Sequence, residues 1–181
     1  MRLRFRLVIS MTENPVKKGF TLVELMIVVT ILGILAAIVL PEFQGHAAES
    51  RESTVKSSLY TVRAQIELYK MQHGGLAPGY IGTIQAPLST LYNQFIGTST
   101  MTGMAVASKT PSGSYLYGPY LTQMPVNPFN DLTTIKMVSS GTTDFSTVAD
   151  DSTGWLYQKE TAIFKINKSG ADSQGNSYVS Y

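Results

Sequence analysis

Apolar residues run almost without interruption through one segment near the start of the chain. Between Phe20 and Leu40 the only formal charge is Glu24. At about 1.5 Å of rise per residue, a helix of this length reaches about 30 Å, the thickness of a bilayer core. The buried helix of a soluble domain would keep a polar face. The pattern therefore predicts one membrane-spanning helix over residues 20–40.

Beyond Pro41 the pattern becomes amphipathic. Apolar residues recur there at spacings of four, three, four and three, which indicates a helix with one buried face: Val55, Leu59, Val62, Ile66 and Tyr69. We expect the charged pairs Arg51/Glu52 and Glu67/Lys70 to form a solvated face. The sequence His73-Gly74-Gly75 favours helix termination, because glycine tolerates the left-handed conformation. Residues 41–73 are thus predicted to continue the membrane helix as its amphipathic half.

A loop region follows at residues 74–132. It is rich in Gly, Pro, Ser and Thr, but Leu88, Leu91, Tyr92 and Phe95 keep helical spacing up to Gly97. This spacing predicts a short second helix within the loop region.

The last segment, residues 133–181, has the composition of a sheet followed by a tail. Three runs rich in β-branched and aromatic residues, 133–138, 154–158 and 162–167, predict three antiparallel strands. Packed on the helix, these strands would bury four large side chains: Trp155, Tyr157, Ile163 and Ile166. The expected fold class is α+β, with a long N-terminal helix on a small antiparallel sheet.

Charge is concentrated at the N-terminus. The chain has a net charge of +2, and the first 19 residues carry the excess: Arg2, Arg4, Arg6, Lys17 and Lys18 against Glu13. The remainder has no basic stripe, which argues against nucleic-acid binding. By the positive-inside rule the N-terminus is cytoplasmic, and the residues after the span face outward. The chain has no cysteine, which excludes disulfides and thiolate chemistry.

The segment KKGFTLVELM, Lys17 to Met26, resembles the processing site of type IV pilins and of the pseudopilins of type II secretion, matching at Gly19, Phe20 and Glu24. The resemblance implies a leader over residues 1–19, cleavage after Gly19 by a prepilin peptidase, N-methylation of Phe20, and retention of the apolar helix. Met11 would give a shorter leader, and we expect it to be the working start.

Glu24 needs an explanation, because a carboxylate in hydrocarbon costs several kcal/mol unless it is paired or near the interface. Cleavage after Gly19 would create an ammonium group on Phe20. In a filament, the ammonium of an incoming subunit could pair with Glu24 of its neighbour and fix the axial register. The alternative is a glutamate that snorkels to the headgroups.

The segment GPYLTQMPVNPF, Gly118 to Phe129, resembles the signature of the major, or G-type, pseudopilins, with Asn127 and Phe129 in place of the commoner aspartate and tryptophan. Major adhesive pilins commonly close their C-terminal region with a disulfide, so the lack of cysteine in this chain favours a pseudopilin. The resemblance implies a structural subunit of a periplasmic pseudopilus, anchored in the inner membrane, with minor pseudopilins and an inner-membrane assembly platform as partners.

Two alternatives stay open. The first is a type IV pilin for adhesion, motility or DNA uptake. The second is a membrane-tethered periplasmic enzyme. Against an enzyme, the sequence holds none of the usual hydrolase, metalloprotease or phosphate-binding motifs. His46 and His73 are most simply isolated, exposed histidines.

A calcium site is a further hypothesis, since major pseudopilins bind calcium in a C-terminal loop. Asp172, Gln174 and Asn176 place oxygen donors at alternate positions, and Asp150 and Asp151 could add charge. Calcium, however, takes six to eight oxygens and usually several carboxylates. A polar turn explains the same residues.

Overall fold

The computed structural model describes residues 19–181, except for the side chains of residues 40–45. The predicted leader therefore lies outside the described residues apart from Gly19, as does Met11. The chain divides into two compact units, one up to Phe43 and one from Gln44 to Tyr181.

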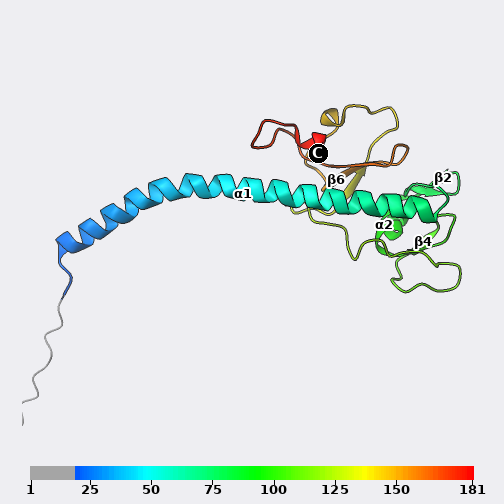
Figure 1. Cartoon of the computed structure of the whole chain (residues 1–181), viewed down its shortest axis with the longest axis horizontal. Coiled ribbons are helices and arrows are strands. Elements are labelled where there is room, and N and C mark those ends of the chain that lie inside the picture. The colour runs from blue at the N-terminus through cyan, green and yellow to red at the C-terminus, as the bar shows by residue number, and fades with distance from the viewer. Residues whose placement is uncertain (1–18) are drawn as a thin grey trace, which may run out of the picture. The chain divides into compact units, whose positions relative to one another are not determined.

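The long helix α1 extends over Leu22–Gln72 (Figure 1). It ends where the sequence predicts. Gly74 and Gly75 both have positive φ, 64° and 90°, and the Gly75 N–H donates to the Lys70 carbonyl at 2.7 Å. This bond satisfies a carbonyl of the last helical turn.

Short elements follow α1. Strands β1, Tyr80–Ile81, and β2, Ile84–Gln85, form one antiparallel pair. Helix α2, Leu88–Ile96, is the predicted short helix and is capped by Gly97. Strands β3, Thr98–Ser99, and β4, Ala105–Val106, form a second antiparallel pair.

The main sheet has the order β5–β6–β7, with β5 at Ile135–Met137, β6 at Trp155–Gln158 and β7 at Ile163–Ile166. Strands β6 and β7 form the predicted antiparallel hairpin, but β5 pairs with β6 in parallel. The prediction of three antiparallel strands was therefore wrong for β5. A parallel pair needs a crossover of about a dozen residues or more. The long connection from β5 to β6, with a 3-10 turn at Phe145–Thr147, provides it.

The sheet and α2 pack along the second half of α1 (Figure 1). Their shared core consists of Val55, Leu59, Val62, Ile66, Leu91, Phe95, Leu121, Met124, Ile135, Trp155, Tyr157, Phe164, Ile166 and Tyr178. The other face of the sheet is also covered, by a cluster of Val138, Phe145, Leu156 and Val179. The expected α+β fold class is confirmed.

One predicted core residue was wrong. Ile163 is 36% exposed, and Phe164 is fully buried in its place. Side chains alternate between the two faces of a strand, so Ile163 and Ile166 cannot share a face. Phe164 and Ile166 can, and both lie in the core.

Hydrogen bonds join the helices to the outer strands. The Arg63 guanidinium of α1 donates to the Phe164 carbonyl of β7 from Nε at 3.1 Å and Nη2 at 2.9 Å. The Ile135 N–H of β5 donates to the Tyr92 hydroxyl of α2 at 2.6 Å. The helices and the sheet are thus held together by polar as well as apolar contacts.

Candidate processing and assembly site

The first turn of α1 is organised by Thr21 and Glu24. The Glu24 N–H donates to Thr21 Oγ1 at 3.2 Å, while the Thr21 N–H and hydroxyl both donate to Glu24 Oε2 at 2.8 Å. This is a capping box, in which two side chains satisfy each other's free backbone N–H groups at the start of a helix. The Thr-x-x-Glu spacing signals it in the sequence, but our sequence analysis missed it.

The capping box leaves room for a second partner on Glu24. Both hydrogen bonds that the Glu24 carboxylate accepts end on Oε2, so among residues 19–181 the other oxygen, Oε1, accepts no hydrogen bond. Phe20 precedes the box and is 85% exposed. Around Gly19, a methyl group in place of the α-hydrogen would meet no atom within 4 Å. The predicted processing residues are therefore accessible next to a preformed helix start.

The apolar half of α1 has no cover within the described residues. The span Leu22–Val39 has a mean hydropathy of 2.8 and none of it is buried. In water such a surface would be unfavourable, because each square ångström of exposed apolar area costs about 25 cal/mol. A bilayer or other protein chains must cover it.

The segment Gly118–Phe129 lies between β4 and β5, the first strand of the main sheet. The Tyr120 and Leu121 N–H groups both donate to the Phe95 carbonyl at the end of α2, at 3.0 and 2.8 Å. The Trp155 indole N–H of β6 donates to the Pro125 carbonyl at 2.8 Å. Asn127 is fully buried and donates from Nδ2 to the Gly154 carbonyl at 3.0 Å. Asparagine thus has a defined structural role at this position.

His73 is buried, which corrects the expectation that it is exposed. Its ring stacks on Tyr69 with centroids 3.7 Å apart, Nδ1 lies 2.8 Å from the Tyr69 carbonyl, and Nε2 lies 3.0 Å from the Ser99 hydroxyl. Burial lowers the pKa of His73, against the opposing effect of its backbone hydrogen bonds. His73 continues the buried stripe of α1 four residues after Tyr69, a signal that our sequence analysis overlooked. His46 is exposed, as expected.

Glu52 is also buried, so the solvated-face expectation was wrong for it. Its carboxylate accepts hydrogen bonds from the Ser173 N–H and hydroxyl. The Glu67/Lys70 pair does lie at the surface, with Lys70 Nζ 2.9 Å from Glu67 Oε1.

The candidate calcium residues form a turn held by Asp172. One carboxylate oxygen accepts from the Gln174 and Asn176 N–H groups at 2.9 and 2.7 Å, and the other from Asn176 Nδ2 at 3.2 Å and the Tyr181 hydroxyl at 2.8 Å. Burial raises the pKa of Asp172, but these bonds outweigh it and lower the pKa to about 2.

This arrangement does not resemble a calcium loop. Both Asp172 oxygens are occupied by donors, and Asp150 and Asp151 bond instead to Lys136 and Lys168. The described part of the chain contains no group of three or more His, Cys, Asp or Glu side chains placed to hold a metal. The calcium hypothesis gains no support from this geometry and stays a prediction.

Comparison with known proteins finds similarity to pilus and type II secretion subunits. A family model for the prokaryotic N-terminal methylation motif matches residues 14–40. A type IV major pilin of Neisseria gonorrhoeae is 30% identical over 55% of this chain and 46% of its own length. The type II secretion system core protein G of Pseudomonas aeruginosa is 28% identical over 64% of this chain and 70% of its own length.

A third relative shows the strongest local identity of these three. The type IV major fimbrial protein of Dichelobacter nodosus is 54% identical over 30% of this chain and 35% of its own length. The chain thus spans half or less of the length of the two pilus proteins. No solved structure matches significantly. None of the relatives described here is named for an enzymatic activity. The chain thus carries the prokaryotic N-terminal methylation motif and is similar both to type IV pilins and to a type II secretion core protein.

Proposed function

We propose that this chain is the structural subunit of a periplasmic pseudopilus that drives protein export by type II secretion. The observation that carries the proposal is the accessible start of α1: a methylation motif, a first-turn carboxylate with one oxygen available, and an uncovered apolar helix. A chain with these features can be held in a bilayer by its apolar helix and can then assemble into a filament.

The choice of type II secretion rests on two further observations. The similarity to core protein G extends over 70% of that protein's length, compared with 46% for the gonococcal pilin. The chain also lacks the cysteines with which adhesive pilins commonly close their C-terminal region.

In this proposal the chain crosses the inner membrane once, with the N-terminus cytoplasmic and residues 44–181 periplasmic. A prepilin peptidase cleaves after Gly19, and Phe20 is methylated. On assembly, the Phe20 ammonium of one subunit pairs with Glu24 of the next, at the oxygen that the capping box leaves available. Minor pseudopilins and the inner-membrane assembly platform are the proposed partners.

A type IV pilin is the second candidate, favoured by the named relatives that are pilus subunits, including the fimbrial protein with 54% local identity. Deleting the gene separates the two. Loss of secreted proteins from the culture medium with unchanged surface pili supports the pseudopilin. Loss of surface pili with unchanged secretion overturns it in favour of the pilin. Restoration by the wild-type gene controls for polar effects.

A further inference from the structure

The segment that follows β4 forms a loop at the surface. Residues 107–114 are all exposed. At the base of the loop Tyr117 pairs with Ser99 of β3: the Ser99 N–H donates to the Tyr117 carbonyl at 2.9 Å, and the Tyr117 N–H donates to the Ser99 carbonyl at 3.1 Å. The loop therefore starts and ends beside the hairpin of β3 and β4. We call residues 107–116 the exposed loop.

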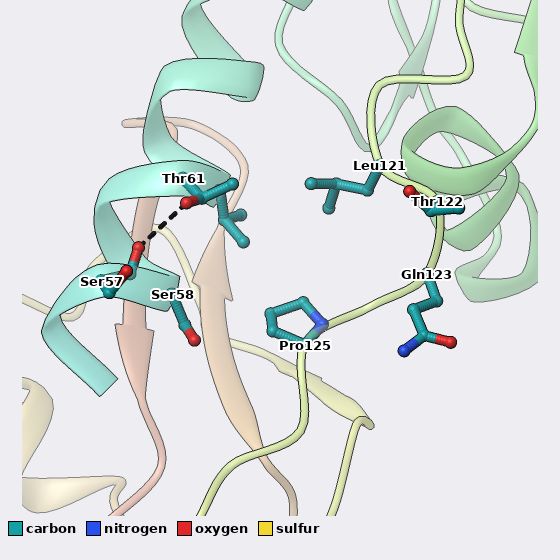
Figure 2. A pocket seen from close by; sticks show the side chains of 8 residues that line it. Ser57, Ser58, Thr61, Leu121, Thr122, Gln123 and Pro125 are labelled. Carbon is teal, nitrogen blue, oxygen red and sulfur yellow. Dashed lines mark hydrogen bonds between the residues drawn. The ribbon is translucent and has the colours of Figure 1, made fainter. Parts of the chain in front are cut away.

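Within residues 19–181, side-chain hydrogen bonds tie the exposed loop to its surroundings at two points. Lys109 donates from Nζ to the Thr122 carbonyl at 2.9 Å. Thr122 lies in one wall of a groove of about 540 Å³ (Figure 2), and Thr61 of α1 lies in the other. At the second point the Tyr115 hydroxyl donates to Met104 Sδ at 3.9 Å. We call this contact the Tyr115 tie, and it is weak, because a thioether sulfur is a weak acceptor.

Met104 is open to solvent. It is 52% exposed, and Met71 and Met101 are 81% and 61% exposed. Met124, in the core, is only 6% exposed. Peroxides oxidise the methionine thioether to a sulfoxide, and the reaction needs access to the sulfur. We therefore expect Met71, Met101 and Met104 to be oxidised before Met124.

The oxidation is a two-electron step that needs only the peroxide as a reactant. One oxygen atom of hydrogen peroxide is transferred to the sulfur, so that the O–O bond breaks, an S–O bond forms and water leaves. The thioether is oxidised and the peroxide is reduced. The product is polar, and methionine sulfoxide reductases return it to the thioether.

Among residues 19–181, Met104 is the only one of these three exposed methionines whose sulfur accepts a hydrogen bond. The 3.9 Å between Met104 Sδ and the Tyr115 hydroxyl leaves room for one oxygen atom on the sulfur, directed at the hydroxyl. That oxygen would come close to the distance of about 2.5–3.0 Å at which O–H···O bonds form. Oxidation of Met104 thus replaces a weak acceptor by a strong one in front of an existing donor.

We propose that Met104 is a reversible modification site, at which a peroxide converts the thioether to a sulfoxide and thereby strengthens the Tyr115 tie. Lys109 already fixes one part of the exposed loop to the groove wall. A firm bond at Tyr115 fixes the other part to the hairpin of β3 and β4, so the oxidised loop is more rigid. The inference does not rest on the proposed filament function, because the detergent-solubilised chain is enough to test it.

Peptide mass spectrometry of the detergent-solubilised chain after treatment with hydrogen peroxide tests the accessibility of the site. Met71, Met101 and Met104 should each gain one oxygen atom at least about tenfold faster than the buried Met124. If Met104 is oxidised no faster than Met124, the proposal is wrong.

Hydrogen–deuterium exchange tests the effect on the loop. After oxidation of the wild type, the amides of residues 107–116 should exchange at least about threefold more slowly. Met101→Leu is the matched control: it removes an exposed methionine but keeps Met104 and Tyr115, so it should show the same slowing.

Met104→Leu and Tyr115→Phe should both melt as the wild type does and show no slowing after oxidation. In the oxidised wild type, methionine sulfoxide reductases for both sulfoxide epimers should restore the original exchange rates. Unchanged exchange in wild type oxidised at Met104, or slowing that persists in Tyr115→Phe, would overturn the proposal.

Discussion

The Glu52 carboxylate of α1 holds the C-terminal loop through Ser173, 121 residues later in the chain. Oε1 accepts from the Ser173 N–H and Oε2 from its hydroxyl, both at 2.9 Å. Glu52 is only 4% exposed. A buried carboxylate is tolerated where hydrogen bonds replace its water, and this pair provides two.

We therefore expect Glu52→Ala to lower the free energy of unfolding by about 1–2 kcal/mol, since hydrogen bonds to a charged group are worth about 1.5–3 kcal/mol and water can reach the exposed Ser173. Melting of the detergent-solubilised chain, followed by the fluorescence of its single tryptophan, Trp155, measures this. Glu67→Ala, which removes an exposed carboxylate from the same helix, should cost less than about 0.5 kcal/mol. Equal costs for the two would contradict the role given to Glu52.

Gly97 allows α2 to pack closely on strand β4. A methyl group at this position would lie 2.0 Å from the Val106 carbonyl oxygen, which is backbone and cannot easily move. Gly97→Ala should destabilise the chain by about 1–3 kcal/mol, as overpacking does. Gly141→Ala is the control, because its methyl group would meet nothing within 4 Å, and it should change stability by less than about 0.5 kcal/mol. A Gly97→Ala variant with the wild-type melting midpoint would show that the β4 backbone can move away from the added methyl group without loss of stability, and would contradict the close-packing role of Gly97.

The amphipathic helix and its core contacts were predictable because they follow from local periodicity. The spacing from Val55 to Tyr69 identifies the buried face of α1, and all five of these residues are buried. The capping box was equally local, so Thr21 could have been found from the sequence. These features depend only on neighbours within one or two turns of helix.

Features that depend on distant partners were not predictable. Nothing near Glu52 in the sequence indicates that Ser173 will provide two donors to it. The parallel pairing of β5 and β6 likewise depends on the path of the long connection between them. Periodicity identifies strands, but it does not order them in a sheet.

Stability should fall as the pH drops below about 6.5, because burial lowers the pKa of His73 below its ordinary value of 6.5. The unfolded chain then binds a proton that the folded chain resists, so acidification favours unfolding until the folded pKa is reached. The surrounding side chains, Tyr69, Tyr117, Tyr120 and Ser99, provide no carboxylate to offset the charge.

Melting midpoints between pH 7.5 and 5.5 measure the effect. His73→Gln should remove most of this pH dependence, whereas the exposed His46→Gln should retain it. The chain has no other histidine. If His46→Gln removes the dependence and His73→Gln does not, the assignment to His73 is wrong.

Glu24→Ala separates processing from assembly. Removing the carboxylate should leave cleavage after Gly19 and membrane insertion intact, because an alanine is more favourable than a carboxylate in lipid. Filaments should fall sharply, since the incoming ammonium loses its partner. Thr21→Val is a useful control: it removes the side-chain half of the capping box but keeps the carboxylate, so it should still assemble. The ratio of cleaved to full-length chain measures processing, and the amount of chain that sediments as filaments after the cells are opened measures assembly. Filaments of wild-type yield from Glu24→Ala would refute the pairing.

Calcium binding at the C-terminal turn is tested by melting the chain in millimolar calcium and in chelator. A ligand at a hundred times its dissociation constant stabilises a protein by about 2.7 kcal/mol, which moves the midpoint by several degrees. In the present geometry, calcium would first have to displace the N–H and O–H donors from both oxygens of Asp172, and the turn offers no second carboxylate. We therefore expect an unmoved midpoint. A rise of several degrees that Asp172→Asn abolishes, and that Asp150→Asn does not, would instead establish a site built by rearranging this turn.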